Sequence, residues 1–184
     1  MMLLYTLTLS LLTFSVSASN FTIPKFYQPY SGESPFEQSI HITKTKNGAC
    51  LQQSINDKRK NAYRCKAEGE IYDPCFHHSF NNDKTLICPK SPWSASAVKI
   101  KTKQRLNNSN HSKLDMSRSM PWAVELIDGT RCLIIGKDKN KPYRYHCQHQ
   151  QFLMGNIYRC KGIWEIYLKN QQQYKTAYIK KAWF

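Results

Sequence analysis

Seven cysteines constrain the fold of this chain more than any other feature of its sequence. They lie at positions 50, 65, 75, 88, 132, 147 and 160, and many neighbours along the chain are about 15 residues apart. That separation suits a bridge between adjacent strands or across a loop, and each bridge would stabilise the fold by roughly 3 kcal/mol. We predict the disulfides Cys50–Cys65, Cys75–Cys88 and Cys132–Cys147, although the spacing alone leaves other pairings open.

An odd number of cysteines leaves one without a partner in the chain. We predict that Cys160 is a free thiol, or that it links two chains as a disulfide-bonded dimer. Its neighbours Arg159 and Lys161 would lower the pKa of the thiol and favour reactivity, whereas the simpler interpretation is a spare thiol that is buried or oxidisable. So many cysteines indicate an oxidising compartment.

The N-terminus reads "MMLLYTLTLSLLTFSVSASN". Its apolar run, Leu3 to Val16, is too short to span a membrane and ends in the small residues before Ser19 that a signal peptidase reads. We predict a signal peptide over residues 1–18, cleaved near Ala18, and a protein that is secreted or periplasmic. No Lys or Arg precedes the apolar run, so an amphiphilic anchor that stays attached is the alternative.

The composition divides the remaining chain into four parts. Residues 19–48 are polar, aromatic and rich in Pro and Gly, which predicts an extended N-terminal arm. Residues 49–106 alternate short apolar and polar segments and predict a first β lobe. Residues 107–119 hold almost nothing apolar and predict a polar loop or linker. Residues 120–184 predict a second β lobe.

Strand signals dominate both lobes. In "AVKIKTK" apolar and cationic residues alternate with a period of two, which is typical of a strand with one buried face. In "WAVELIDGTRCLIIG" the pair Asp128-Gly129 separates two apolar runs and predicts a hairpin. We predict a mainly β fold: a small disulfide-stabilised sandwich or barrel-like domain, or two β lobes. At most one short helix is expected, near Leu51 and Ile55.

The stretch "GEIYDPCFHH", residues 69–78, holds two carboxylates, a thiol and two imidazoles. A bridged Cys75 would supply no thiolate, and neighbouring residues of a strand, such as His77 and His78, point to opposite faces. Asp73-Pro74 is typical of the start of a turn. We favour the neck of a disulfide-closed loop over a metal or catalytic site, and we predict no metal and no cofactor.

Common catalytic motifs are missing from the chain: it has no Gly-rich phosphate loop, HExxH, GxSxG or CxxC. The remaining catalytic hypothesis is a small secreted hydrolase that uses Glu70 or Asp73 with His77 or His78. We rank this below a non-catalytic protein.

The net charge of +15, from 27 basic and 12 acidic residues, favours weak attraction to polyanions. The best candidate for anion binding is a cationic row on one predicted strand, about 20 Å long: Lys99, Lys101, Lys103 and Arg105. Lysines on an exposed strand also prevent aggregation between sheet edges, which is the competing explanation.

The motifs "YRC…EIYDPCF…CP…PWS" and "PWAVELIDGTRC", with a closing "AWF", resemble a family of small secreted bacterial proteins of unknown function, many of them actinobacterial. The resemblance covers Cys50 to Phe184. It implies export and a framework of the first six cysteines, and Cys160 stands where the family has a small polar residue. It implies no activity. The cationic row is a departure of this chain, which is richer in Lys and Asn than the family.

These observations together predict a secreted or periplasmic binding module that interacts with the cell envelope, with an anionic polymer or a membrane surface as partner. A small hydrolase and a secreted enzyme inhibitor are the alternatives.

Overall fold

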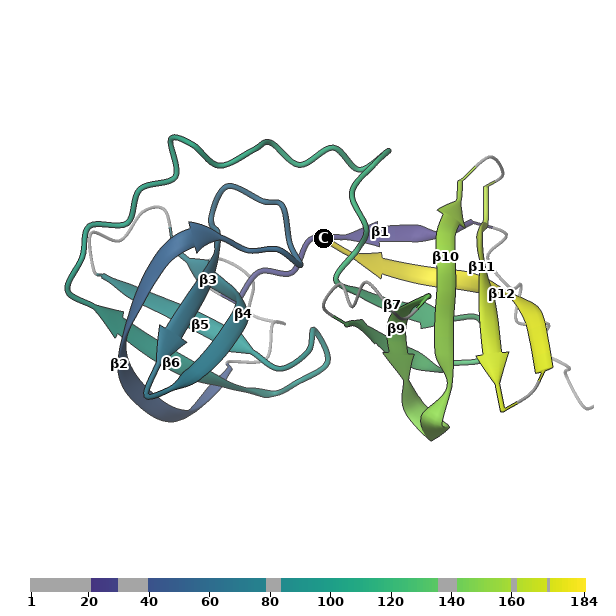
Figure 1. The fold of residues 1–184 in the computed structure, drawn as a ribbon, viewed down its shortest axis with the longest axis horizontal. Coiled ribbons are helices and arrows are strands. Elements are labelled where there is room, and N and C mark those ends of the chain that lie inside the picture. The colour runs from purple at the N-terminus through teal and green to yellow at the C-terminus, as the bar shows by residue number, and fades with distance from the viewer. Residues whose placement is uncertain (1–20, 30–39, 79–83, 136–141, 160–161, 172) are drawn as a thin grey trace, which may run out of the picture.

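The computed structural model describes residues 21–29, 40–78, 84–135, 142–159, 162–171 and 173–184. More than half of these residues are in strands, and the helix among them is one short 3-10 helix, η1 (Gln148–Gln150) (Figure 1). The strands are β1 (Ile23–Lys25), β2 (His41–Gln53), β3 (Ala62–Ala67), β4 (Glu70–His77), β5 (Thr85–Pro89), β6 (Ser96–Thr102), β7 (Ala123–Leu126), β8 (Arg131–Ile134), β9 (Tyr143–Cys147), β10 (Phe152–Tyr158), β11 (Trp164–Asn170) and β12 (Gln173–Trp183).

The first barrel consists of β2 to β6 in chain order, and it closes because the long β2 pairs at both edges. The first part of β2 runs parallel to β6, and its second part runs antiparallel to β3. Gly48 lies where the pairing changes and is in register with both Thr102 and Ala67. A Cβ at Gly48 would lie 2.6 Å from the carbonyl oxygen of Lys66, so only glycine permits this approach.

The second barrel consists of β7 to β12 and closes through pairing of β12 with β7. Strand β1, from the N-terminal part of the chain, adds to it in parallel beside the end of β12. The predicted hairpin at Asp128-Gly129 is confirmed: it joins β7 and β8, and Gly129 has the positive φ of 85° that the turn requires.

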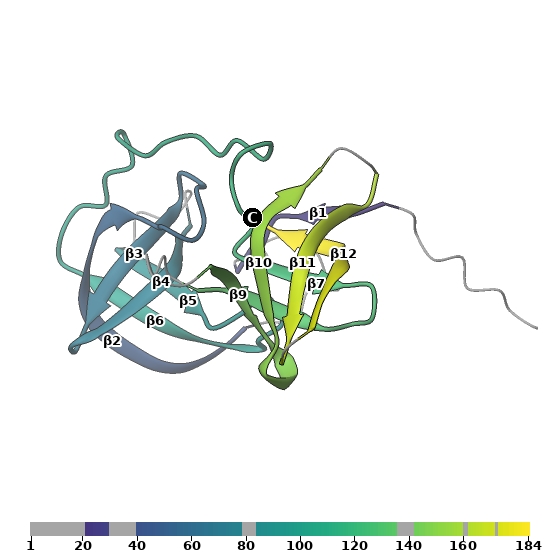
Figure 2. The same ribbon diagram turned by 45° about the vertical axis from the view of Figure 1, so that its right-hand side comes forward.

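The two barrels lie side by side (Figures 1 and 2). An aromatic junction joins them. Phe76 of β4 and Trp122, just before β7, are both buried in it, with ring centroids 6.2 Å apart. Tyr27 lies against both rings, at 5.3 Å and 5.6 Å. Trp93 and Trp183 form a second edge-to-face contact across the junction, at 5.0 Å. The C-terminal Phe184 ends beside this junction and is buried.

Residues 107–119 connect the barrels without any strand or helix, in agreement with their polar composition. The segment is held on the first barrel by His111, whose Nδ1 lies 2.8 Å from the Lys60 carbonyl, and by Ser112, whose amide donates to the Gln53 side chain. From the second barrel, the guanidinium of Arg159 donates to the carbonyls of Ser117 and Ser119.

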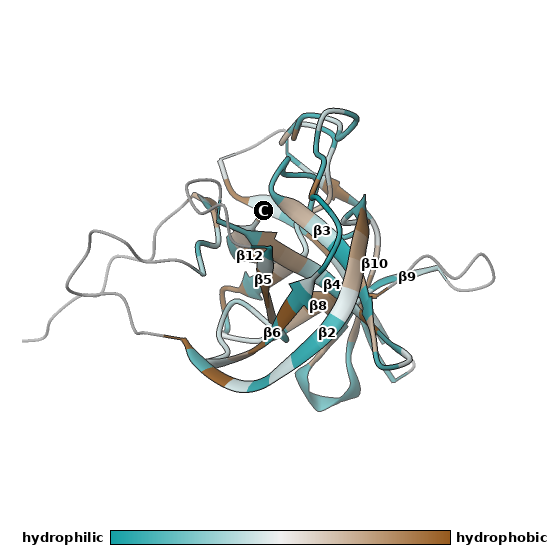
Figure 3. Cartoon of the chain, turned by 90° about the vertical axis from the view of Figure 1, so that its left-hand side faces the viewer, coloured by the Kyte–Doolittle hydropathy of each residue, from teal (hydrophilic) through white to brown (hydrophobic). Residues whose placement is uncertain are grey.

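The predicted mainly β fold is confirmed, as two barrels. Two local expectations differ from the structure. Residues 19–48 are not wholly an extended arm, because β1 lies within them and β2 begins at His41. The expectation of at most one short helix holds for the described residues, but the candidate near Leu51 and Ile55 is not helical: Leu51 belongs to β2, and both side chains are exposed. The outer strand β2 is largely hydrophilic along its length (Figure 3), which explains why its first half resembled an arm.

Residues 1–18 and the predicted cleavage site lie outside the described residues. Within the described part of the chain, no helix has the length and apolar character needed to cross a membrane.

Candidate functional site

The three predicted disulfides are confirmed: Cys50–Cys65 joins β2 to β3, Cys75–Cys88 joins β4 to β5, and Cys132–Cys147 joins β8 to β9. Each connects adjacent antiparallel strands and lies in a barrel core. Three such bridges indicate an oxidising, extracytoplasmic environment. Cys160 lies outside the described residues.

The stretch "GEIYDPCFHH" coincides with strand β4, and Cys75 within it is oxidised to a disulfide. The expectation that Asp73-Pro74 opens a turn is wrong, because both residues lie inside β4, joined by a cis peptide bond. Among the described residues, the sulfurs of Cys65, Cys75 and Cys88 lie within 4.8 Å of one another. All three are in disulfides, so none is a thiolate that could bind a metal.

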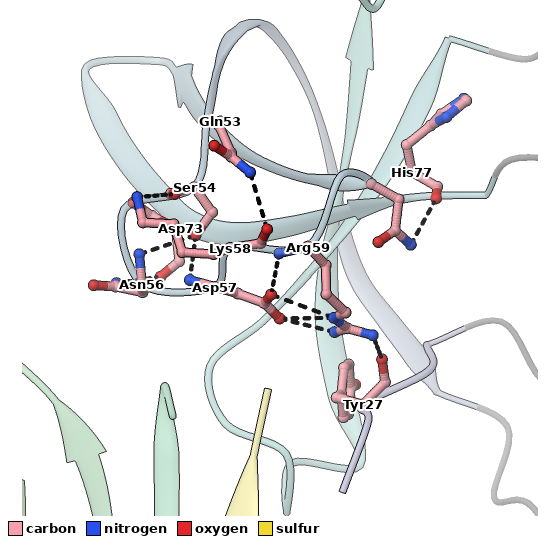
Figure 4. A network of polar contacts seen from close by, with 10 residues as sticks. Tyr27, Gln53, Ser54, Asn56, Asp57, Lys58, Arg59, Asp73 and His77 are labelled. Carbon is pink, nitrogen blue, oxygen red and sulfur yellow. Dashed lines mark hydrogen bonds and ion pairs between the residues drawn. The ribbon is translucent and has the colours of Figure 1, made fainter. Parts of the chain in front are cut away.

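Asp73 is a structural carboxylate that fixes the turn following β2 (Figure 4). It accepts hydrogen bonds from the Ser54 hydroxyl and from the Ile55 amide, the latter at 3.1 Å. The Asn56 side chain donates to the Asp73 carbonyl at 3.1 Å. Burial raises the pKa of Asp73, and the hydrogen bond from Ser54 opposes this rise. The site is therefore arranged to hold a loop in place.

A second polar group beside it connects the first barrel to the N-terminal segment (Figure 4). Asp57 is fully buried and pairs with Arg59 through contacts of 2.8 Å and 3.0 Å. Arg59 also donates to the Tyr27 carbonyl at 2.6 Å, and its guanidinium lies 4.6 Å from the Phe76 ring centroid. No sequence pattern points to this pair, because residues of opposite charge two positions apart are common on any protein surface.

Glu70, the first residue of β4, is held in a cluster with Lys46 and Tyr72. The Lys46 ammonium lies 2.7 Å from Glu70 and 3.3 Å from Glu68, and the Tyr72 hydroxyl also donates to Glu70. The hydrogen bond with Lys46 lowers the pKa of Glu70 and raises that of Lys46. This cluster lies at the edge of an open pocket of about 740 Å³ between β2, β4 and the adjoining ends of β5 and β6.

The carboxylates and histidines of the hydrolase hypothesis lie far apart on β4. Glu70 and His77 are at opposite ends of the strand, so their backbones are separated by roughly 23 Å at the usual strand rise. Asp73 and His77 are separated by roughly 13 Å on the same basis. A general acid and base must both reach the reacting atoms, and these positions do not bring them together.

The cationic residues predicted to bind anions are only partly on a strand. Lys99 and Lys101 belong to β6, whereas Lys103 and Arg105 follow its end at Thr102. The structure brings a fifth cation to them: the ammonium of Lys84 donates to the Lys103 carbonyl at 3.1 Å. We call this group the β6 cation patch: Lys84, Lys99, Lys101, Lys103 and Arg105.

The cations of the patch are available to a ligand. Four of them are exposed and Lys99 is half-buried. No carboxylate of the described residues forms an ion pair with any of the five. Lys84 lies 15 positions before Lys99 in the sequence. The antiparallel pairing of β5 with β6 places it here, and the alternating pattern of β6 alone gives no sign of it.

Comparison with known proteins gives no relative: no protein-family model, no curated protein and no solved structure matches the chain. The resemblance noted in the sequence remains a prediction, and any function has to be argued from the surfaces of the two barrels.

Proposed function

We propose that the protein is a secreted or periplasmic, non-catalytic binding module that attaches to an anionic polymer of the cell envelope. The observation that carries the proposal is the β6 cation patch, five cations gathered at one end of the first barrel without a carboxylate partner among the described residues. The disulfides support an extracytoplasmic location.

A polymer suits this patch better than a small anion. Lys99 and Lys101 are two residues apart on β6, so their backbones are about 7 Å apart, and the remaining cations continue beyond the strand. Repeated charges on one ligand can neutralise several of these cations at once, which releases condensed counterions and gives a steep dependence on salt. The net charge of +15 adds long-range attraction to the same partner.

The test uses inorganic polyphosphate, a polyanion without rings, as the probe. We expect binding that weakens steeply as the salt concentration rises. Lys99→Gln, Lys101→Gln and Lys103→Gln combined should reduce the slope of log affinity against log salt by up to about 3, or about one for each lost contact. Titration calorimetry at several salt concentrations measures both quantities.

The matched control changes three exposed lysines elsewhere, Lys113, Lys175 and Lys180, to glutamine. This control has the same net charge as the first variant, so it should keep most of the slope. Equal losses in the two variants would mean that overall charge, rather than the patch, attracts the polymer. An affinity that is independent of salt would refute the proposal.

Neither alternative function is favoured by a specific observation. A hydrolase using Glu70 or Asp73 with His77 or His78 would need groups that β4 holds apart, and both carboxylates are engaged in hydrogen bonds within the fold. A secreted enzyme inhibitor remains a prediction from the sequence.

A further inference from the structure

The outer surface of the second barrel exposes four tyrosines on three adjacent strands. Tyr158 ends β10, Tyr167 lies on β11, and Tyr174 and Tyr178 lie on β12. Their exposed fractions are 62%, 54%, 61% and 38%, which is unusual for side chains of this size. We call this surface the tyrosine face. Exposed aromatic groups that gather on one face mark binding sites more often than scattered ones do.

The register of the strands makes the face continuous. Glu165 of β11 is in register with both Tyr158 and Tyr178, so these three form one row across the sheet. Tyr167 and Thr176 form the next row, and Lys169 and Tyr174 the one after that. Neighbouring strands are about 4.8 Å apart, and successive rows about 7 Å. The rings are therefore close enough to contact consecutive units of one extended ligand.

One end of the face carries a cation in a fixed position. The ammonium of Lys169 donates to the Tyr143 hydroxyl at 2.9 Å, and lies 5.4 Å and 5.6 Å from the ring centroids of Tyr143 and Tyr174. Near the other end a shallow hollow of about 150 Å³ lies between Tyr158 and Tyr167. Glu165 and Thr176 also line this hollow, so polar side chains lie next to aromatic rings there.

The chemistry of this surface is that of a sugar-binding platform. Each tyrosine presents an apolar ring and a hydroxyl, and the exposed large hydrophobic side chains described on β9 to β12 are all tyrosines. The core of a protein–protein interface usually combines aromatic and aliphatic groups with few charges. A sugar ring has an apolar face of C–H groups and a rim of hydroxyls, which matches rings placed beside a carboxylate, a threonine and a lysine.

We propose that the tyrosine face binds a polysaccharide, with sugar rings stacked on Tyr158, Tyr167 and Tyr178 and one ring seated in the hollow. The disulfide-bonded fold indicates a compartment in which extracellular polysaccharides are available. The inference is independent of the β6 cation patch, because it uses a different barrel and needs no charge on the ligand.

The experiment measures binding of the full chain to four uncharged polysaccharides: cellulose, chitin, xylan and laminarin. Pull-down assays with the insoluble polymers, and affinity electrophoresis with the soluble ones, should show binding of at least one polysaccharide with little dependence on salt. Tyr158→Ala combined with Tyr167→Ala should weaken it by on the order of tenfold per ring, the usual effect of removing a stacking aromatic.

Two controls separate ring stacking from other effects. Tyr158→Phe combined with Tyr167→Phe keeps the rings and should retain binding within a few-fold. Leu51→Ala combined with Ile71→Ala removes exposed apolar groups from the first barrel and should change nothing. All these side chains are exposed, so the thermal midpoint should be the same in each variant.

Three outcomes would overturn the inference. One is that none of the four polysaccharides binds. Another is that binding survives in the Tyr→Ala variant. A third is that the face serves another partner. Binding of single-stranded poly(dT) through the same tyrosines would show this, and so would self-association on gel filtration that the Tyr→Ala variant abolishes. Loss of polyphosphate binding in the lysine variant would leave this inference untouched, so the two proposals can fail separately.

Discussion

At the scale of single residues, Asp73 illustrates how a carboxylate that resembles a catalytic group serves the fold. Its side chain accepts hydrogen bonds from the loop after β2, and its carbonyl accepts another from Asn56. Burial nevertheless raises its pKa above the ordinary value of 3.8, because the loss of water outweighs these bonds. Ionising the Asp73 carboxyl therefore costs more free energy in the folded protein than in the unfolded chain.

This sign makes a prediction for Asp73→Asn. A raised pKa in the folded state contributes stability that is present below the unfolded value and is lost as the pH rises through the folded value. We expect the free energy of unfolding of the wild type, minus that of the variant, to increase as the pH falls from 7 to below 3.8. Urea titrations across this range measure the difference. The other carboxylates are present in both proteins, so their contributions to the pH dependence cancel.

A difference that decreases on acidification would mean that the hydrogen bonds from Ser54 and Ile55 dominate, and that the pKa of Asp73 is lowered.

At the scale of secondary structure elements, the pairing between β4 and β5 is the shortest in the first barrel. Only Phe76 and His77 of β4 are in register with β5, opposite Ile87 and Leu86. The disulfide Cys75–Cys88 lies directly beside these two pairs. The bridge therefore compensates for the short pairing between β4 and β5. The first half of β4 does not pair with β5 and borders the open pocket instead.

We expect Cys75→Ala combined with Cys88→Ala to lower the free energy of unfolding by roughly 3 kcal/mol, as for other loops of this length. Hydrogen exchange at Leu86 and Ile87 should become faster before the rest of the barrel unfolds. Urea unfolding and hydrogen-exchange mass spectrometry measure the two effects.

The matched control removes Cys132–Cys147, whose strands β8 and β9 have three residue pairs in register. Loss of this disulfide should lower the free energy of unfolding by a similar amount, without selectively faster hydrogen exchange in β8 or β9. Equal local exchange in both variants would contradict the special role given to Cys75–Cys88.

What the sequence could predict depends on how far apart the interacting residues are. The hairpin at Asp128-Gly129 and the three disulfides follow from residues at most 15 apart. The curvature of β2 and the addition of β1 to β12 depend on pairing between distant segments, which no local pattern contains. The tyrosine face is predictable only in part. In "WEIYLKN" the alternation already places Tyr167 on the other face of the strand from the buried Ile166 and Leu168.

At the scale of the whole molecule, the aromatic junction joins the barrels into one unit. Phe76 and Trp122 come from different barrels and are both almost completely buried by the contact, with Tyr27 against them. The linker over residues 107–119 is tied to both barrels as well. Most of the coupling should nevertheless come from the junction, since buried aromatic surface contributes more than exposed hydrogen bonds.

Truncating either side of the junction should uncouple the barrels. We expect Trp122→Ala and Phe76→Ala each to lower stability by about 3–5 kcal/mol and to split a single unfolding transition into two. Circular dichroism and tryptophan fluorescence, followed during urea unfolding, should then give different midpoints. Tyr174→Ala, an exposed aromatic outside the junction, is the control and should keep one transition. Coincident transitions in both junction variants would show that the barrels are coupled elsewhere.

The parallel pairing of β1 with β12 also has a consequence for the timing of folding. Residues 23–25 pair with residues 181–183, so the first strand of the described residues pairs with the last one. All five strands of the first barrel lie between them in the sequence. The first barrel can therefore close without β12, whereas the second barrel and its pairing with β1 are completed only when β12 is in place. Contacts between such distant segments also form slowly. Until β12 is in place, β1 lacks the strand with which it pairs, and the edges of β7 and β11 that β12 covers stay open.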